Sequence, residues 1–125
     1  MLNDVLLYVG GGAIAAWGIA HIVPTRSIVR GFGAISRDNR LILAMESVAE
    51  GMTLIFLGVL VILVTAIAGS GSQAAHVAYL ACAGMLLVMA ILTLVTGART
   101  SILPYKICPA VKTTVAILFV LGTVL

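Results

Sequence analysis

Charged side chains are scarce in this sequence: seven Lys or Arg and four Asp or Glu make up 9% of its 125 residues. A soluble domain carries about 25% charged residues, whereas 62% of this chain is hydrophobic. A chain of 12.9 kDa cannot bury that much apolar surface in water, because small domains leave much of their surface exposed. The scarcity of charge therefore excludes an ordinary soluble domain. It predicts one compact membrane domain, residues 1–125, with the lipid bilayer as its surroundings and no nucleic-acid partner.

Cysteine is also rare, and basic residues are missing from the start of the chain. Cys82 and Cys108 form no C-x-x-C pair, and we expect them near opposite ends of their helices, too far apart to bridge within one chain. This argues against a thiol–disulfide enzyme, although cysteines of two subunits can still meet. The first four residues carry an acid, Asp4, where a signal peptide carries basic residues. We therefore expect the first apolar segment to be retained as a helix.

Four apolar segments have about the 20 residues that cross roughly 30 Å of hydrocarbon. They cover residues 5–23, 41–67, 75–98 and 107–125. Pro24 ends the first segment, the turn residues 69–72 end the second, and Pro109 is expected in the first turn of the fourth. The second segment is longer than a bilayer requires, so it tilts or projects. The predicted fold is an all-α integral membrane bundle of four antiparallel helices, up-down-up-down.

All seven basic residues fall on one predicted side of the membrane. They are Arg26, Arg30, Arg37, Arg40, Arg99, Lys106 and Lys112. Positively charged loops stay in the cytoplasm, so both termini are expected to be extracytoplasmic. We expect a bacterial or archaeal cytoplasmic membrane, and the strong bias argues against dual topology.

The only long connection, residues 24–40, mixes apolar and basic side chains, which is typical of a segment lying in the membrane interface. We expect Arg26 and Arg30 to contact anionic lipid headgroups. The alternative is that they bind the anionic head of a ligand. Residues 31–33 supply a bend, and the next helix has three candidate capping residues, Ser36, Asp38 and Asn39.

Small residues form a stripe on the first helix, at Gly11, Ala15 and Gly18. Such a stripe lets two helix backbones approach closely, and Gly51 and Gly58 can receive a neighbour in the same way. We favour packing within the chain, and a homo-oligomer contact is the alternative.

Two carboxylates lie within the second apolar segment. Glu46, Glu50 and Thr53 are spaced four and three apart and share one helical face. An ionisable group at bilayer depth costs about 2.5–3.5 kcal/mol on insertion scales, so it marks a candidate functional site. Glu50 is the deeper one, and we expect it to serve as the acid/base or hydrogen-bonding group, kept protonated by desolvation.

The other helices bring polar residues to the same end of the bundle. A cation at position 112 faces the positive end of its helix dipole and needs a partner, for which Glu46 and Glu50 are both candidates. A purely structural ion pair is the alternative to a functional site. The candidate catalytic residues are Glu50, Glu46 and His21. The candidate ligand-binding residues are Lys112, Thr53, Thr96, Trp17, Arg26, Arg30 and Tyr105.

No metal or cofactor is expected. His21 with the two glutamates makes only a weak metal-site pattern. His76 lies at the opposite end of the bundle, which excludes a bis-histidine haem within one subunit but not a haem with one axial histidine at an oligomer interface.

The Gly18-x-x-His21 motif, the basic loop and a second helix that opens with Glu46 and Glu50 together resemble small DoxX-like membrane proteins. The resemblance covers the layout and two short stretches, and it implies a four-helix membrane protein. We expect the chain to bind or convert a lipophilic small molecule near the cytoplasmic side. The alternatives are a proton-coupled transporter acting as an oligomer, and a non-catalytic subunit of a larger membrane complex. The residues leave open whether the chain is an enzyme.

Overall fold

The computed structural model describes all 125 residues, and every regular element in it is a helix. The elements are α1 (Leu2–Ile22), α2 (Thr25–Arg30), α3 (Arg37–Ala68), α4 (Gln73–Val95), the short 3-10 helix η1 (Gly97–Arg99) and α5 (Leu103–Val124). Four stretches are long and apolar enough to cross a membrane: α1, α3, α5, and α4 continued through η1. The prediction of an all-α chain is confirmed, and so is the prediction of four helices long and apolar enough to span a membrane.

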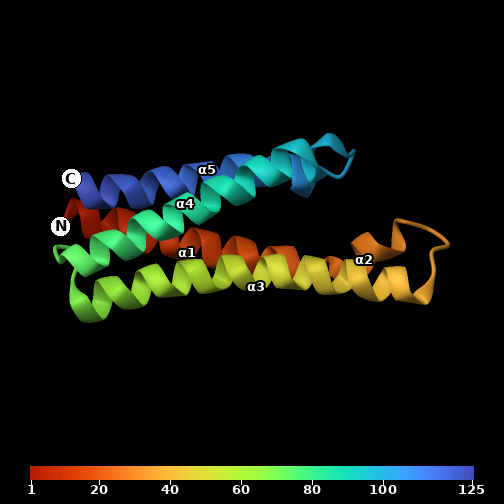
Figure 1. Cartoon of the computed structure of the whole chain (residues 1–125), viewed down its shortest axis with the longest axis horizontal. Coiled ribbons are helices and arrows are strands. Elements are labelled where there is room, and N and C mark those ends of the chain that lie inside the picture. The colour runs from red at the N-terminus through yellow and green to blue at the C-terminus, as the bar shows by residue number, and fades with distance from the viewer.

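The four long helices lie side by side along the long axis of the molecule (Figure 1). Figure 1 shows both termini at one end, beside the turn between α3 and α4, and we call this the terminal end. The opposite end, which we call the loop end, carries α2 and the two connections 31–36 and 100–102. Helix α1 packs against α3 and α5, and α4 packs against α5.

Glycines bring α1 and α3 into backbone contact. A methyl group added at Gly18 would stand 2.6 Å from the carbonyl oxygen of Gly51, and one added at Gly11 would stand 2.9 Å from that of Gly58. Only residues without a Cβ allow this approach. The small-residue stripe is therefore used within the chain, as we favoured, and the homo-oligomer contact at this stripe is not available because α3 covers it.

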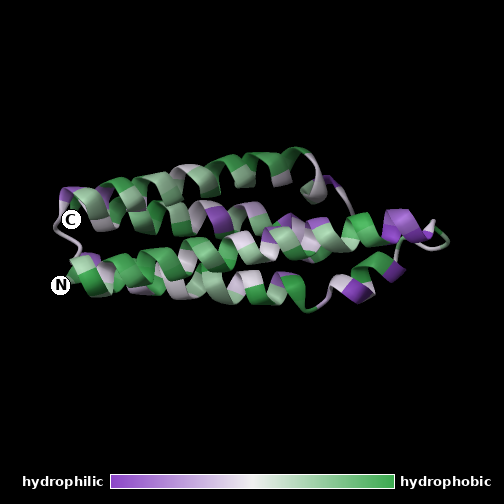
Figure 2. Cartoon of the chain, turned by 60° about the horizontal axis from the view of Figure 1, so that its bottom comes forward, coloured by the Kyte–Doolittle hydropathy of each residue, from purple (hydrophilic) through white to green (hydrophobic).

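Apolar side chains fill the terminal half of the bundle. Leu54, Val61 and Phe119 are fully buried there, and the buried Tyr79 hydroxyl hydrogen-bonds the Thr65 hydroxyl at 2.8 Å. Figure 2 shows the contrast, with mostly hydrophobic residues toward the terminal end and hydrophilic residues gathered toward the loop end. The polar residues of the chain are thus concentrated at one end of a packed bundle.

The helix boundaries differ from the predicted ones mainly at the loop end. Ser36 caps α3, because its Oγ accepts a hydrogen bond from the backbone N–H of Asn39 at 3.1 Å. Arg37 and Arg40 therefore lie in the first turn of α3, and not in a loop. The connection 24–40 also contains a helix of its own, α2.

The prediction that Pro109 lies in the first turn of the last helix is wrong. Helix α5 begins at Leu103, where Pro104 occupies the first turn, so Pro109 falls inside the helix. Proline has no N–H to donate, which leaves the carbonyl of Tyr105 without its usual partner one turn earlier. The earlier start also adds a turn before Lys112, which therefore lies further from the start of its helix than the predicted boundary at residue 107 implies.

Candidate functional site

One polar residue from each long helix meets at a single point near the loop end. Lys112 of α5 donates hydrogen bonds from Nζ to Oε1 of Glu50 on α3 and, at 2.9 Å, to Oγ1 of Thr93 on α4. His21 of α1 places its Nε2 2.9 Å from Oε2 of the same glutamate. We call these four residues the four-helix cluster, because it joins all four long helices.

The buried Lys112 forms its ion pair with Glu50 and not with Glu46. Lys112 is completely buried, whereas the Glu50 side chain keeps 28% of its surface exposed. A buried ammonium group requires an opposite charge and full hydrogen bonding. Glu50 supplies that charge, whereas Glu46 makes no ion pair. The expectation that desolvation keeps Glu50 protonated does not fit this geometry, because the carboxylate is the counter-charge of the ammonium group.

The His21 ring meets Glu50 through an ion-pair contact that is not an aligned hydrogen bond. The side chain is 7% exposed, and its Nε2 lies close to Glu50 without the alignment of a hydrogen bond. The ring packs against Tyr105 with ring centres 5.7 Å apart. Since buried polar atoms normally have a polar partner, Glu50 is the group that accommodates this nitrogen.

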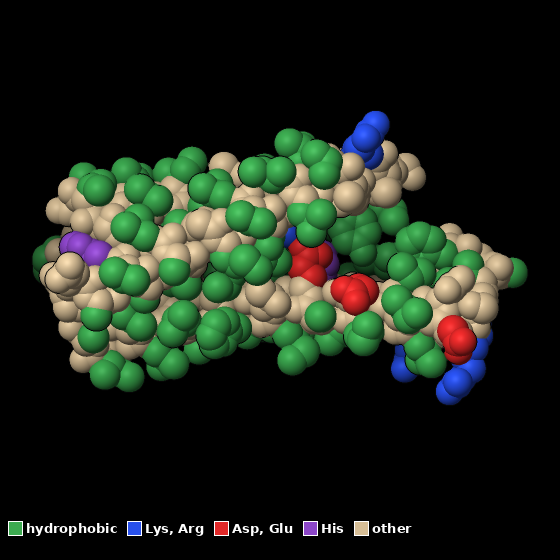
Figure 3. Space-filling model, viewed as in Figure 1, with side chains coloured by type: hydrophobic (Ala, Val, Ile, Leu, Met, Phe, Trp, Pro, Cys, Tyr) green, Lys and Arg blue, Asp and Glu red, His purple; other side chains and the backbone are tan.

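A cavity of about 530 Å³ opens beside the four-helix cluster, between α3 and α4. Figure 3 shows acidic side chains next to a hollow on this face, with hydrophobic side chains around it. Its apolar wall includes Ile28, Phe32, Met85, Met89 and Leu92. Its polar wall includes His21, Glu46, Glu50, Thr53, Thr96 and Tyr105. The volume lies within the range of pockets for small organic ligands, and the mixture of walls is typical of such pockets.

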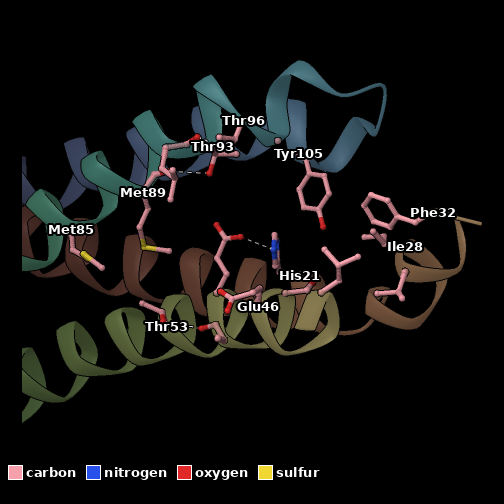
Figure 4. Close-up of a pocket in the computed structure, with 17 residues that line it drawn as sticks. His21, Ile28, Phe32, Glu46, Thr53, Met85, Met89, Thr93, Thr96 and Tyr105 are labelled. Atoms are coloured by element: carbon pink, nitrogen blue, oxygen red, sulfur yellow. Dashed lines mark hydrogen bonds and ion pairs between the residues drawn. The ribbon is translucent and has the colours of Figure 1, made fainter. Parts of the chain in front are cut away.

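Six of the ten predicted site residues line this cavity: Glu50, Glu46, His21, Thr53, Thr96 and Tyr105. Figure 4 shows the Tyr105 ring projecting into the space between His21 and Phe32. Thr53 and Thr96 donate their hydroxyl protons to carbonyls of their own helices, at 2.8 and 2.6 Å.

The other four predicted residues lie outside the cavity wall. Lys112 stands behind the cavity wall and contacts two residues that line it, Glu50 and Thr93. Trp17 lines a neighbouring cavity of about 140 Å³, which also touches His21 and Tyr105, and donates from Nε1 to Sγ of Cys108 at 3.3 Å.

Arg26 and Arg30 are exposed on α2 and do not line the cavity. The structure therefore does not bring these arginines to the place where they would hold an anionic ligand head.

Thr93 and the apolar wall were absent from the predicted site. The sequence places Thr93 and Thr96 on one helical face, but spacing alone does not say which of them is buried against α5. The apolar wall carries no signal of its own, because Phe32, Met85 and Met89 look like other hydrophobic residues until the helices are positioned.

The structure brings together no group of three or more His, Cys, Asp or Glu side chains that could hold a metal ion. Of the weak metal pattern seen in the sequence, only His21 and Glu50 are in contact. Cys82 and Cys108 are both buried and free.

No protein-family model, no characterised protein and no solved structure matches this chain. Its function must therefore be inferred from the geometry of the cavity and of the four-helix cluster.

Proposed function

We propose that the chain is an integral membrane protein whose four long helices cross the bilayer antiparallel, up-down-up-down, with both termini outside and the loop end in the cytoplasm. The glycine contacts support the direction of the helices, because residues 11 and 18 of α1 meet residues 58 and 51 of α3 in reverse order. Six of the seven basic residues support the orientation, since they lie in or near the connections of the loop end. The seventh, Lys112, is buried and does not count.

Within that membrane protein we propose a binding site for a lipophilic small molecule, with the DoxX-like proteins as the family of similar layout. One observation carries the proposal. A cavity with an apolar wall has a buried, charge-balanced polar cluster along one side. Burying charge is costly, and a cluster that held only the fold would not need an open cavity beside it.

The depth of the cluster supports entry from the cytoplasmic leaflet. Glu50 lies 18 residues before the end of α3 at Ala68, which is about 27 Å along the axis at ~1.5 Å per residue. This distance is close to the roughly 30 Å thickness of the hydrocarbon. The polar cluster therefore lies near the inner boundary of the hydrocarbon, and the wall at Met85 and Met89 lies on its apolar side. A ligand would keep its apolar body toward the lipid and its polar group toward Glu50 and His21.

In this proposal Lys112 is a positioning residue, because it holds the Glu50 carboxylate from outside the cavity wall, and Thr93 in turn accepts a hydrogen bond from Lys112. Glu50 and His21 contact the polar group of the ligand. The proposal is one of binding, and it assigns no reaction.

Proton-coupled transport ranks second. A transporter needs a route to the opposite side, whereas Leu54, Val61 and Phe119 fill the terminal half of the bundle. The packed terminal half favours a site with one opening.

Photolabelling tests the proposed site. The protein in phosphatidylcholine vesicles is irradiated with dodecanol carrying a diazirine in its chain, and the labelled peptides are mapped. We expect label on the cavity segments 85–96 and 43–53, removed by excess unlabelled dodecanol. Label spread evenly over all lipid-facing helix surfaces, and not removed by competitor, would contradict the proposal.

A further inference from the structure

The charges on the cavity wall are all of one sign. Glu46 and Glu50 are the only Asp, Glu, Lys or Arg side chains that line the cavity. Lys112 balances Glu50 from behind, but Glu46, one turn earlier on α3, makes no ion pair and no hydrogen bond through its side chain. One uncompensated negative charge therefore remains on the wall beside the four-helix cluster.

The threonine hydroxyls of the wall all act as hydrogen-bond donors to their own helices. Thr53, Thr93 and Thr96 each donate their hydroxyl proton to a carbonyl one turn earlier, at 2.8, 2.9 and 2.6 Å. A hydroxyl has one proton to donate and two lone pairs to accept with. Once the proton is used by the helix, Thr53 and Thr96 offer only acceptor positions to the cavity. Carboxylates add further acceptors, so the polar wall offers more acceptor positions than donors and favours a ligand that donates hydrogen bonds.

The aromatic side chains of the wall also favour a cation. Figure 4 shows the rings of Tyr105 and Phe32 at the loop-end side of the cavity, and aromatic faces attract cations. A ligand group that donates hydrogen bonds satisfies the free carboxylate and the unused acceptors together.

From these observations we infer that the ligand is a lipophilic amine in its protonated form. Its ammonium group donates to Glu46 and to the acceptor positions near Glu50, and its apolar body lies along Met85 and Met89. This inference rests on the proposed lipophilic site and names its ligand class. It separates an amine from an alcohol or a carboxylic acid, and a primary ammonium group from a quaternary one, which has charge but no N–H.

The test uses four radiolabelled probes with the same twelve-carbon chain: dodecylamine, dodecyltrimethylammonium, dodecanol and dodecanoate. Binding is measured to the protein in phosphatidylcholine vesicles at neutral pH, with binding to protein-free vesicles subtracted. We expect dodecylamine to bind at least about tenfold more tightly than dodecanol, because its hydrogen bond to a carboxylate is charge-assisted. Dodecyltrimethylammonium should bind more weakly than dodecylamine, and dodecanoate should bind least.

Two variants locate the preference. Glu46→Gln should reduce the amine-to-alcohol affinity ratio to about one, because it removes the free negative charge from the wall. Asp38→Asn removes an exposed carboxylate from the first turn of the same helix, outside the cavity, and should leave the ratio at its wild-type value.

The outcomes separate this inference from the proposed function. Equal affinity for amine and alcohol in the wild type overturns the amine inference while the lipophilic site stands. Equal affinity for the primary and quaternary ammonium probes overturns the need for N–H donors, and a ratio that survives Glu46→Gln overturns the role of that carboxylate. Binding of no probe above protein-free vesicles overturns the proposed function itself.

Discussion

Lys112 is a lysine that the protein buries completely and compensates fully. Its ammonium group meets a carboxylate on one helix and a threonine hydroxyl on another, so the cluster links α3, α4 and α5 through a single side chain. Such a pair contributes little net stability when intact, but leaving one partner without the other is costly. The lysine therefore fixes the position of Glu50 beside the cavity.

Lys112→Met should destabilise the bundle by about 3–5 kcal/mol, because it leaves the Glu50 carboxylate without its counter-charge. Adding Glu50→Gln should recover much of this loss, whereas adding Glu46→Gln should recover none. Thermal unfolding in detergent measures these differences, with Lys106→Met as the control for loss of an exposed lysine. Equal recovery by both glutamine variants would contradict the assignment of Glu50 as the partner.

At the residue scale, the sequence predicted which side chains lie at the cavity better than which of them contact one another. Helical spacing put Glu46, Glu50 and Thr53 on one face, and all three line the cavity. Spacing did not distinguish the two glutamates as partners of Lys112, because that depends on how α5 lies against α3. Spacing also did not show that Thr93, and not Thr96, is the buried threonine. That depends on how α5 packs against α4.

At the scale of the elements, the pairing of α1 with α3 sets the geometry of the site. Gly11 and Gly18 lie seven residues apart on α1, as do Gly51 and Gly58 on α3, and they meet pairwise. This contact carries His21, three residues after Gly18, to the level of Glu50. The glycine stripe was readable from the sequence, and so was its use within the chain. The start of α5 was not, because Pro104 and Pro109 are both acceptable first-turn residues in isolation.

Gly18→Ala should destabilise the protein by about 1–3 kcal/mol, because its methyl group would stand 2.6 Å from the Gly51 carbonyl oxygen and force the backbones apart. Gly12→Ala is the matched control on the same helix, since an added Cβ there meets nothing within 4 Å. Thermal unfolding of the two variants in the same detergent gives the comparison. A Gly18→Ala protein as stable as Gly12→Ala would mean that the helices are not in backbone contact.

At the scale of the whole molecule, polarity is divided along the bundle axis. The terminal end carries packed apolar side chains, and the loop end carries the cavity, the four-helix cluster and most of the basic residues. Figure 2 shows the matching gradient, with hydrophilic residues gathered toward the loop end. Composition and hydropathy predicted this division and the four helices that are long and apolar enough to span a membrane. The cavity itself was beyond prediction, because it exists only where α3 and α4 separate.

The proposed orientation has a direct test in intact cells. A single cysteine at Ser72, in a background without Cys82 and Cys108, should react with a membrane-impermeant thiol reagent, because the turn before α4 faces outward. A single cysteine at Ser36 should react only after the membrane is opened. The reverse pattern would place the basic loop end outside and contradict the positive-inside assignment.

The central claim, a lipophilic molecule bound between α3 and α4, is tested most directly by filling the cavity. Gly97 borders the cavity, and an added Cβ there makes ordinary contact with Tyr105 at 3.5 Å, so Gly97→Leu adds bulk without a backbone clash. Gly84→Leu adds the same side chain to α4 where nothing lies within 4 Å.

The measurement is competitor-sensitive labelling of the cavity segments by the diazirine-bearing dodecanol in both variants. We predict that Gly97→Leu loses most of this labelling and that Gly84→Leu keeps the wild-type level. Equal labelling of the two variants would contradict the proposed binding site.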